Sequence, residues 1–168
     1  MGMNVYMTGG TIDFLIKIKE KHPSLDFHFM TSGANAVAYY ENATKNVFSS
    51  GRAYEALYTS GSLQDKGFVM MNNVPVADDG RTIFEDRYRD RNQVIENVPG
   101  FQAFRFLRPK KNNTYVILTQ WATEQDYENW KGSHAYQQIF QDLSAKPPAY
   151  FLERPFIATY HMYSTDEA

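Results

Sequence analysis

The sequence predicts an α+β protein whose C-terminal part, residues 66–168, is a ferredoxin-like domain of the dimeric α+β barrel type. Two observations predict this fold. Strand-like and helix-like runs follow one another there in the order βαββαβ, and a polar, glycine-containing stretch at 60–67 separates them from a shorter first half. Residues 1–65 are therefore expected to form a smaller α/β domain of their own.

The first strand of the C-terminal domain is predicted by alternation along 68–76. One polar residue shares a face with apolar ones: Phe68, Met70, Asn72, Val74 and Val76. A helix follows, because Thr82 and Glu85 have the spacing of a capping box. Inward positions recur at helical spacing at Phe84, Tyr88, Arg91 and Ile95, whereas the charged residues of 86–91 are interpreted as a solvated face.

A hairpin and a second helix complete the pattern. The runs 101–108 and 114–121 read as two strands joined across a polar turn. Thr123 and Asp126 have the spacing of a helix cap, and the predicted helix carries Trp130 and Phe140, with a kink expected at Gly132. A β-rich run at 156–163 supplies the last strand.

The first half reads as a truncated copy of the second. We predict a strand at 3–7, a helix at 12–21, two paired strands at 27–30 and 36–40, and a second helix at 52–58, which gives the order βαββα. A ferredoxin-like sheet carries helices on one face, and its bare face would expose a large apolar area. We therefore expect the N-terminal sheet to cover that face, so that a monomer with pseudo-dimeric halves is favoured and a homodimer is the alternative.

Composition excludes several classes of function. The 168 residues carry a net charge of −2 and no cysteine, which disfavours nucleic-acid binding and excludes thiolate chemistry. No run is long and apolar enough for a membrane span, and no secretory signal is evident, so a cytoplasmic location is expected. The four histidines occur singly, without the spacing of a metal site, and we predict no resident metal.

Two side chains stand out as candidates for chemistry. Asn72 is predicted to point into the core with its apolar neighbours, and a buried amide must find partners. It either bonds a neighbouring backbone group or lines a pocket and binds a ligand. Trp130 lies on an amphipathic helix, where an aromatic residue packs in the core or contacts a ligand. The residues alone leave both alternatives open.

The run from Trp121 to Ser133 (WATEQDYENWKGS), preceded by TYVILTQ, resembles the haem-degrading monooxygenases of the IsdG and HmoB type. The segment 97–101 (NVPGF) fits the same pattern, and the N-terminal YMTGGTIDFL and KGFVMMNNVPV are similar to the longer, two-part HmoB form. The resemblance implies the antibiotic-biosynthesis-monooxygenase fold. It also implies that haem is both substrate and cofactor, with O₂ and an external electron donor, a reductase or a small reductant.

The resemblance implies a site built from an asparagine on the first strand, a tryptophan and an iron-ligating histidine. Asn72 matches by strand face, although an ungapped count from Gly80 favours Asn73, and Trp130 matches directly. The histidine position is occupied by Phe140. His134, six residues earlier, is the remaining candidate iron ligand, although ideal helical geometry places it on another face. Phe140, Tyr136 and Met70 are expected to line the pocket.

The chain also resembles the TRAP-like staphylococcal signalling proteins, which have phenylalanine at the same place. That family is described as membrane-associated regulators or stress proteins. Three hypotheses follow: oxidative degradation of haem with release of iron, a non-enzymatic signalling or stress-response role on the same scaffold, and a cofactor-independent monooxygenase acting on an aromatic substrate. Asn72 with Trp130 favours the first hypothesis, and Phe140 favours the second.

Overall fold

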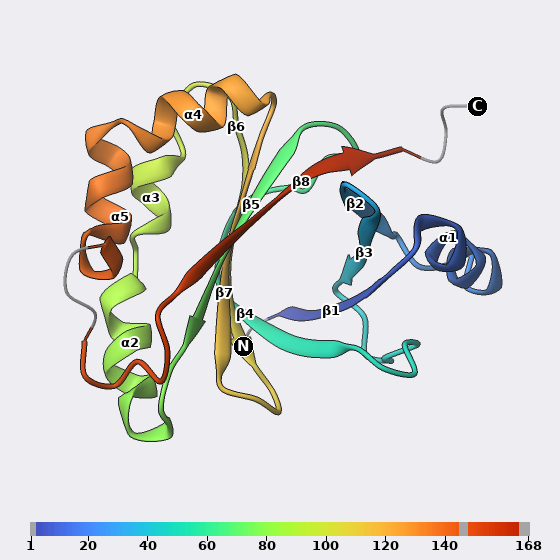
Figure 1. Ribbon diagram of the computed structural model, residues 1–168, viewed down its shortest axis with the longest axis horizontal. Helices are drawn as coiled ribbons and strands as arrows, with labels where there is room; N and C mark the ends of the chain where they lie inside the picture. Colours follow the sequence, from blue (N-terminus) through green and yellow to red (C-terminus); the bar gives the residue numbers. More distant parts are fainter. Residues whose placement is uncertain (1–2, 145–147, 165–168) are drawn as a thin grey trace.

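Eight strands close into an antiparallel barrel in the computed structural model, which describes residues 3–144 and 148–164. Around the barrel the strands follow the order β1-β3-β2-β8-β5-β7-β6-β4 (Figure 1). In chain order the elements are β1 (Met3–Gly10), α1 (Ile12–Lys21), β2 (His28–Ser32), β3 (Asn35–Glu41), β4 (Arg52–Gly61), β5 (Phe68–Pro75), the 3₁₀ turn η1 (Asp78–Gly80), α2 (Arg81–Tyr88), α3 (Asn92–Ile95), β6 (Phe101–Pro109), β7 (Thr114–Trp121), α4 (Glu124–Lys131), α5 (His134–Ser144) and β8 (Phe156–Tyr163).

The C-terminal half has the predicted ferredoxin-like order, with each predicted helix divided in two. Asp90 has a φ of 64°, a left-handed conformation that separates α2 from α3. The capping box predicted at Thr82 and Glu85 is wrong, because α2 begins one residue earlier and no side chain caps it. The second helix stops at Gly132, so Trp130 and Phe140 lie on different helices, α4 and α5.

The predicted second helix at 52–58 is also wrong, because this segment is strand β4. The strand pairs with β1 on one side and with β6 on the other. Tyr54 and Ala56 point into the barrel and are buried there. The backbone bonds of two neighbouring strands and the burial of this alternating face decide the conformation, so tertiary contacts override a helix-like composition.

The two halves of the chain share one barrel. Strand β4 joins β1 to β6, and β8 joins β2 to β5. The apolar interior combines both halves, with Val5, Met7 and Met30 against Met71 and Leu118. The N-terminal sheet therefore faces the C-terminal sheet as expected, but a separate small N-terminal domain is not confirmed. The monomeric state stays a prediction.

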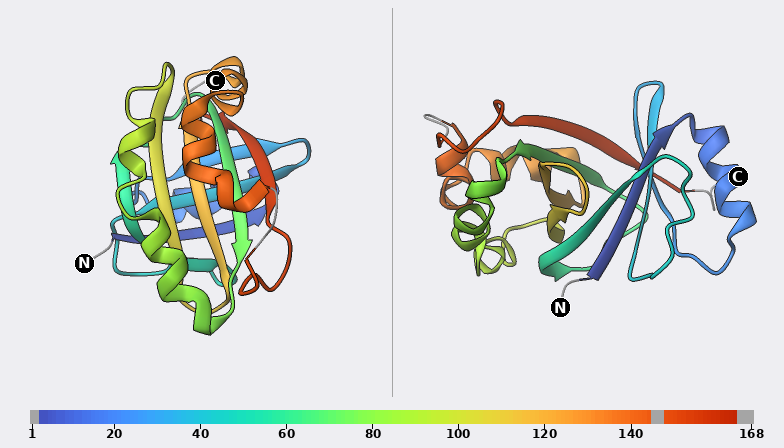
Figure 2. Two further views of the ribbon diagram at one scale, coloured as in Figure 1. Left: turned by 90° about the vertical axis from the view of Figure 1, so that its left-hand side faces the viewer. Right: turned by 90° about the horizontal axis from the view of Figure 1, so that it is seen from below.

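Helices cover the outside of the barrel on two opposite sides. Figures 1 and 2 show α2, α3, α4 and α5 against the outer face of the C-terminal sheet, and α1 beyond the N-terminal sheet. Leu15 anchors α1 in a third apolar cluster with Phe27, Phe29 and Tyr40. Among the described helices, none has the length and hydropathy needed to cross a bilayer.

A buried ion pair inside the barrel ties the halves together. The guanidinium of Arg105 on β6 donates from Nε to Oε2 of Glu41 on β3 at 3.0 Å and from Nη2 to Oε1 at 3.2 Å. The Tyr39 hydroxyl donates to Glu41 Oε2 at 2.6 Å. Burial by itself raises the pKa of Glu41, but the hydrogen bonds from Arg105 and Tyr39 and the charge of Arg105 outweigh it and lower that pKa.

We predict that Glu41→Gln lowers the free energy of unfolding at pH 7 by about 3 kcal/mol, because it leaves the Arg105 charge buried without a carboxylate. The folded pKa of Glu41 lies below the unfolded value of about 4.3, so its contribution is complete above that pH. It is lost as the pH falls through the folded pKa. Urea unfolding of both proteins from pH 7 to pH 3 measures this. The exposed Glu128→Gln, at the surface pair with Lys131, is the matched control. An undiminished difference at pH 3 would contradict the account.

Candidate functional site

The helices α2–α5 lie over the outer face of β5, β6 and β7 (left view of Figure 2), and a largely aromatic cluster of buried side chains packs between them. We call this space the sheet–helix layer. Its buried members are Phe68, Met70, Val74, Val76, Phe84, Tyr88, Ile95, Phe104, Phe106, Tyr115, Ile117, Trp121, Tyr127, Trp130, Ile139 and Phe140. Such a layer excludes water and offers flat apolar surfaces, which suits a planar aromatic ligand.

Helix α4 positions Trp130 in this layer. Thr123 caps the helix as predicted, accepting a hydrogen bond from the Asp126 amide at 3.1 Å. The Trp130 ring lies 4.7 Å from the ring centroid of Trp121, which comes from β7. Trp121 Nε1 donates to Thr119 Oγ1 at 3.0 Å, whereas Trp130 Nε1 is buried and has no hydrogen-bond partner among the described residues.

Strand β5 positions Asn72 with its side chain on the same side of the sheet, in register with Ile117 on β7 and Ile157 on β8. Asn72 is 4% exposed, and its Oδ1 has no hydrogen-bond partner within the described parts of the chain. An unmatched buried acceptor costs about 1–3 kcal/mol. Asn72 Oδ1 can accept a hydrogen bond from a ligand, and Trp130 Nε1 can donate one.

The structure separates Asn72 from Asn73. Asn73 lies on the same face of β5 as Met71 and Val69, whose side chains point into the barrel. Its Nδ2 donates to the carbonyl oxygens of Met71 and Phe156, both at 3.3 Å. Asn73 is thus satisfied on the barrel side, and Asn72 is the amide in the sheet–helix layer.

The three residues predicted to line a pocket also lie in or beside this layer. Met70 and Phe140 are buried there, and Tyr136 is partly buried against them. Ring centroids of Trp130 and Tyr136 are 4.9 Å apart, those of Trp130 and Phe140 5.9 Å, and those of Tyr136 and Phe140 5.1 Å. The three rings pack on one another, so a planar ligand must displace at least one of them to reach Trp130.

Tyrosines in this layer are neutral hydrogen-bond donors near neutral pH. Burial, followed by the charges of Tyr136 and Glu128, raises the pKa of Tyr127 to about 12. Burial also raises the pKa of Tyr136. Neither phenol is therefore poised to bind a metal as a phenolate.

All four histidines are described, and none is buried in the sheet–helix layer. His134 begins α5 with an exposed side chain, so the structure gives no support to it as an iron ligand. His161 contacts Phe68 at the margin of the layer, but its side chain is 67% exposed. His22 ends α1, and His28 is buried on β2 beside Asp65. No group of three histidine, cysteine or acidic residues is arranged to hold a metal in the described ranges.

Arg91 links α5 to the neighbouring helices, a contact that sequence analysis missed. Its Nη1 donates to the carbonyl oxygen of Ile139 on α5 at 3.0 Å, and its guanidinium lies 5.1 Å from the Tyr88 ring centroid. The signal was present, since Arg91 continues the inward spacing of Phe84 and Tyr88. We interpreted it as part of a solvated face because arginines on surface helices usually are.

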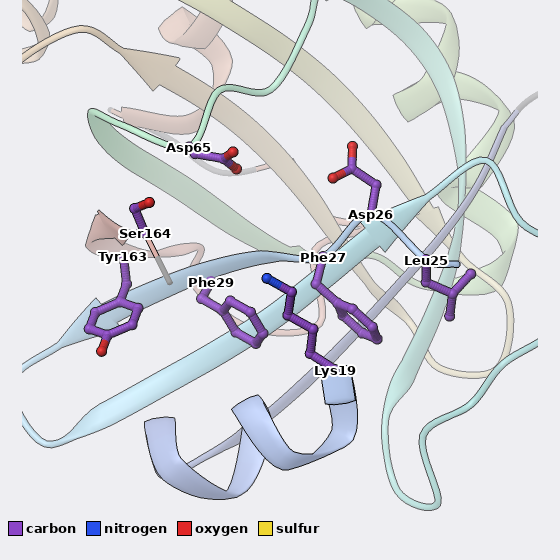
Figure 3. A pocket seen from close by; sticks show the side chains of 8 residues that line it. All are labelled: Lys19, Leu25, Asp26, Phe27, Phe29, Asp65, Tyr163 and Ser164. Carbon is purple, nitrogen blue, oxygen red and sulfur yellow. The ribbon is translucent and has the colours of Figure 1, made fainter. Parts of the chain in front are cut away.

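Of the cavities lined by described residues, two bear on the location of the site. One of about 160 Å³ reaches Trp130 from the loop before β6, with Pro99 and Asn129 at its rim. Another, of about 130 Å³, lies in the N-terminal half beside α1, between Lys19, Asp26, Phe29 and Asp65 (Figure 3). None of the predicted site residues lines the second cavity, so we place the candidate site at Trp130.

Comparison with known proteins agrees with the resemblance seen in the sequence. Residues 67–142 match the model of the antibiotic biosynthesis monooxygenase family. The signal transduction protein TRAP of Staphylococcus aureus is 29% identical over 136 residues, 81% of each chain. A haem-degrading monooxygenase of Listeria monocytogenes is 23% identical over 135 residues, 80% of this chain and 81% of that protein. A solved structure of a major regulator of staphylococcal pathogenesis has a TM-score of 0.84 at 25% identity, covering 94% of this chain and 97% of that one.

We predict that Asn72→Leu raises the free energy of unfolding by about 1 kcal/mol, because it removes an unmatched buried acceptor. Asn73→Leu is the matched control one residue along the strand. It removes two hydrogen bonds inside the barrel and should lower that free energy by about 1–3 kcal/mol. Urea midpoints of the two variants measure the contrast. Equal destabilisation by both would mean that Asn72 is a structural residue.

Proposed function

We propose that this chain, whose residues 67–142 match the antibiotic biosynthesis monooxygenase family, binds haem in the sheet–helix layer and degrades it oxidatively, releasing iron. One observation carries the proposal. Asn72 Oδ1 on β5 and Trp130 Nε1 on α4 are both buried in this layer and have no hydrogen-bond partner among the described residues. A buried polar atom without a hydrogen bond lowers the stability of the folded protein. A ligand that forms the missing hydrogen bond restores that free energy in the complex.

The chain's own residues fit haem in two respects. Trp130, Tyr136 and Phe140 would give the macrocycle apolar surroundings once these packed rings separate, and Asn72 would offer it a hydrogen-bond acceptor. The four histidines lie outside this layer, so the macrocycle would be held there by its faces. Bound haem would supply the oxygen-activating chemistry, and an external reductant would supply electrons. The layer excludes bulk water and orients the ring.

The proposal predicts a Soret band when haemin is added, and decay of that band in air when ascorbate follows, with iron released to a ferrous chelator. Asn72→Leu and Trp130→Phe each remove one polar atom and keep the apolar walls. We expect both variants to bind haemin within about threefold of the wild type and to degrade it at least about tenfold more slowly. Wild-type protein that binds no haemin, or that leaves bound haemin intact under ascorbate, would contradict the proposal.

A second candidate function is regulatory, on the same scaffold. Phe140 favours it, since a buried phenyl ring packed on Trp130 and Tyr136 closes the layer where the resemblance puts an iron ligand. The relative named signal transduction protein TRAP is consistent with this alternative. A cofactor-independent monooxygenase of an aromatic substrate is the third, because the Asn72–Trp130 pair does not by itself require iron.

Replacing Phe140 tests whether this position faces haem. Phe140→His should tighten haemin binding by about tenfold and give the spectrum of a histidine-ligated iron, because the imidazole nitrogen then lies in the layer. It should also cost about 2 kcal/mol of stability, since an unligated imidazole is smaller and more polar than phenyl. Haemin titration with thermal unfolding measures both effects, and Phe140→Leu controls for lost volume. A folded Phe140→His protein with wild-type affinity and spectrum would favour the regulatory function.

A further inference from the structure

A further cavity of about 510 Å³ lies at the end of α1, and its volume is that of a small-molecule site. One wall is the segment 22–25 that follows α1, and the other is the loop 42–47 between β3 and β4. Leu25, Ala43 and Val47 give the cavity apolar surface, and its titratable lining residues are His22 and Lys45. Helix α1 lies on the opposite side of the barrel from α2–α5, so this cavity is separate from the sheet–helix layer (Figure 1).

The loop that forms the second wall is fixed to the N-terminal sheet through its carbonyl oxygens. Three successive carbonyls each accept a hydrogen bond from a side chain of β1 or β3: Ala43 from Asn4 Nδ2 at 3.2 Å, Thr44 from the Tyr6 hydroxyl at 3.3 Å, and Lys45 from the Tyr40 hydroxyl at 2.7 Å. The Val47 amide donates to the same Tyr40 hydroxyl at 2.9 Å. These bonds hold the loop in one conformation before any ligand arrives.

The same bonds determine where the amide groups of the loop point. The C=O and N–H of a trans peptide point in opposite directions, and the peptide bonds here are trans. The N–H groups of Thr44, Lys45 and Asn46 therefore point away from the tyrosine and asparagine side chains that bind the carbonyls. None of these three N–H groups has a hydrogen-bond partner within residues 3–144 and 148–164. Successive backbone N–H groups turned to one side form a binding site for an anion.

The charges around the loop also favour an anion. Lys45 lines the cavity and makes no ion pair in the described part of the chain. Lys110 lies behind the loop, where its Nζ donates to Asn4 Oδ1 at 2.6 Å and is 5.7 Å from the Tyr6 ring centroid. No acidic side chain is among the described residues that line the cavity.

The acidic residues next to the two walls in the sequence face elsewhere. Glu41, at the end of β3, points into the barrel and is paired with Arg105. Asp26 lines the smaller cavity of Figure 3, and its carboxylate lies 3.8 Å from His28 Nε2. That smaller cavity also contains Asp65. The carboxylates of this region are thus gathered in the smaller cavity and inside the barrel, and the larger cavity keeps a positive potential.

We propose that the larger cavity binds a small organic anion. Its oxyanion, a phosphoryl or carboxylate group, is held by the N–H groups of residues 44–46 and by the Lys45 ammonium, and its apolar body lies against Leu25, Ala43 and Val47. The oxyanion lies on the loop side because His22 ends α1, where the helix carbonyl groups carry partial negative charge. This site goes beyond the proposed function and does not depend on it, since the N-terminal half builds it outside residues 67–142.

Four small molecules test the site. Phenyl phosphate and benzoate each carry an oxyanion on an apolar ring, benzyl alcohol has the ring without the charge, and inorganic phosphate has the charge without the ring. We expect at least one of the two aromatic anions to bind with a Kd below about 1 mM, and about tenfold more tightly than benzyl alcohol or inorganic phosphate. Amide NMR signals of residues 44–46 should shift on binding. The tighter of the two aromatic anions identifies the oxyanion that the site prefers.

Two substitutions on the exposed surface of the loop test the role of its charge. Lys45→Met should weaken binding of the aromatic anion about fivefold, as expected for one partly hydrated charge. Thr44→Glu places a carboxylate beside the free N–H groups and should weaken binding at least about tenfold. Lys17→Met removes an exposed lysine of α1 that does not line the cavity and is the matched control. Haemin binding should be the same in all three variants and the wild type.

Two results would overturn the inference. One is equal binding of the aromatic anions and benzyl alcohol, or binding that leaves the amide signals of residues 44–46 unmoved. The other is wild-type affinity for the aromatic anion in a folded Thr44→Glu protein. Neither result bears on haem, and a wild-type protein that binds no haemin would leave the anion site standing. The comparison of ligands on the wild type needs no variant, so it remains decisive if a substitution disturbs the fold.

Discussion

The C-terminal sheet must bury both of its faces, and the rest of the structure depends on that constraint. Along β5, Met70 and Val74 point toward the helices while Val69 and Met71 point into the barrel, and all four are buried. Helices α2–α5 cover one face, and the N-terminal strands cover the other by closing the barrel. A sheet that is apolar on both faces must pack against another layer on each face. Here the helices and the N-terminal strands of the same chain provide these two layers.

The two faces differ in how their polar groups are satisfied, and this places the candidate site. Inside the barrel, Arg105 is paired with Glu41, and Asn73 bonds two carbonyl oxygens. In the sheet–helix layer, Asn72 and Trp130 each keep one buried polar atom without a described partner. A satisfied network rigidifies the fold, whereas an unmatched donor and acceptor in an apolar space are what a ligand-binding layer presents before its ligand is bound. The satisfied polar groups and the proposed binding residues therefore lie on opposite sides of one sheet.

Similarity to known proteins relates residues 67–142 to one family but does not choose an activity. The signalling protein and the haem-degrading enzyme each align with about four-fifths of this chain, at 29% and 23% identity. The choice depends on a few side chains in the sheet–helix layer. Trp130 and Asn72 each place a buried polar atom in this layer, and position 140 is occupied by phenylalanine where the resemblance implies a histidine. A fold of this kind supports several functions, so these residues carry the functional argument.

The sequence by itself determined what depends on local periodicity and capping: the ferredoxin-like order, the strand at 68–76 and the cap at Thr123. The resemblance added Trp130 as a site residue. Tertiary structure decided the rest, because the deciding contacts are distant in sequence. The segment 52–58 became a strand only between β1 and β6. Asn72 and Asn73 are the same residue type. Only the packing of the sheet gives Asn73 its hydrogen bonds and leaves Asn72 Oδ1 without a described partner. Arg91 has the inward spacing of its helix, but its hydrogen-bond partner is the Ile139 carbonyl on α5, 48 residues later, which only the fold brings to it.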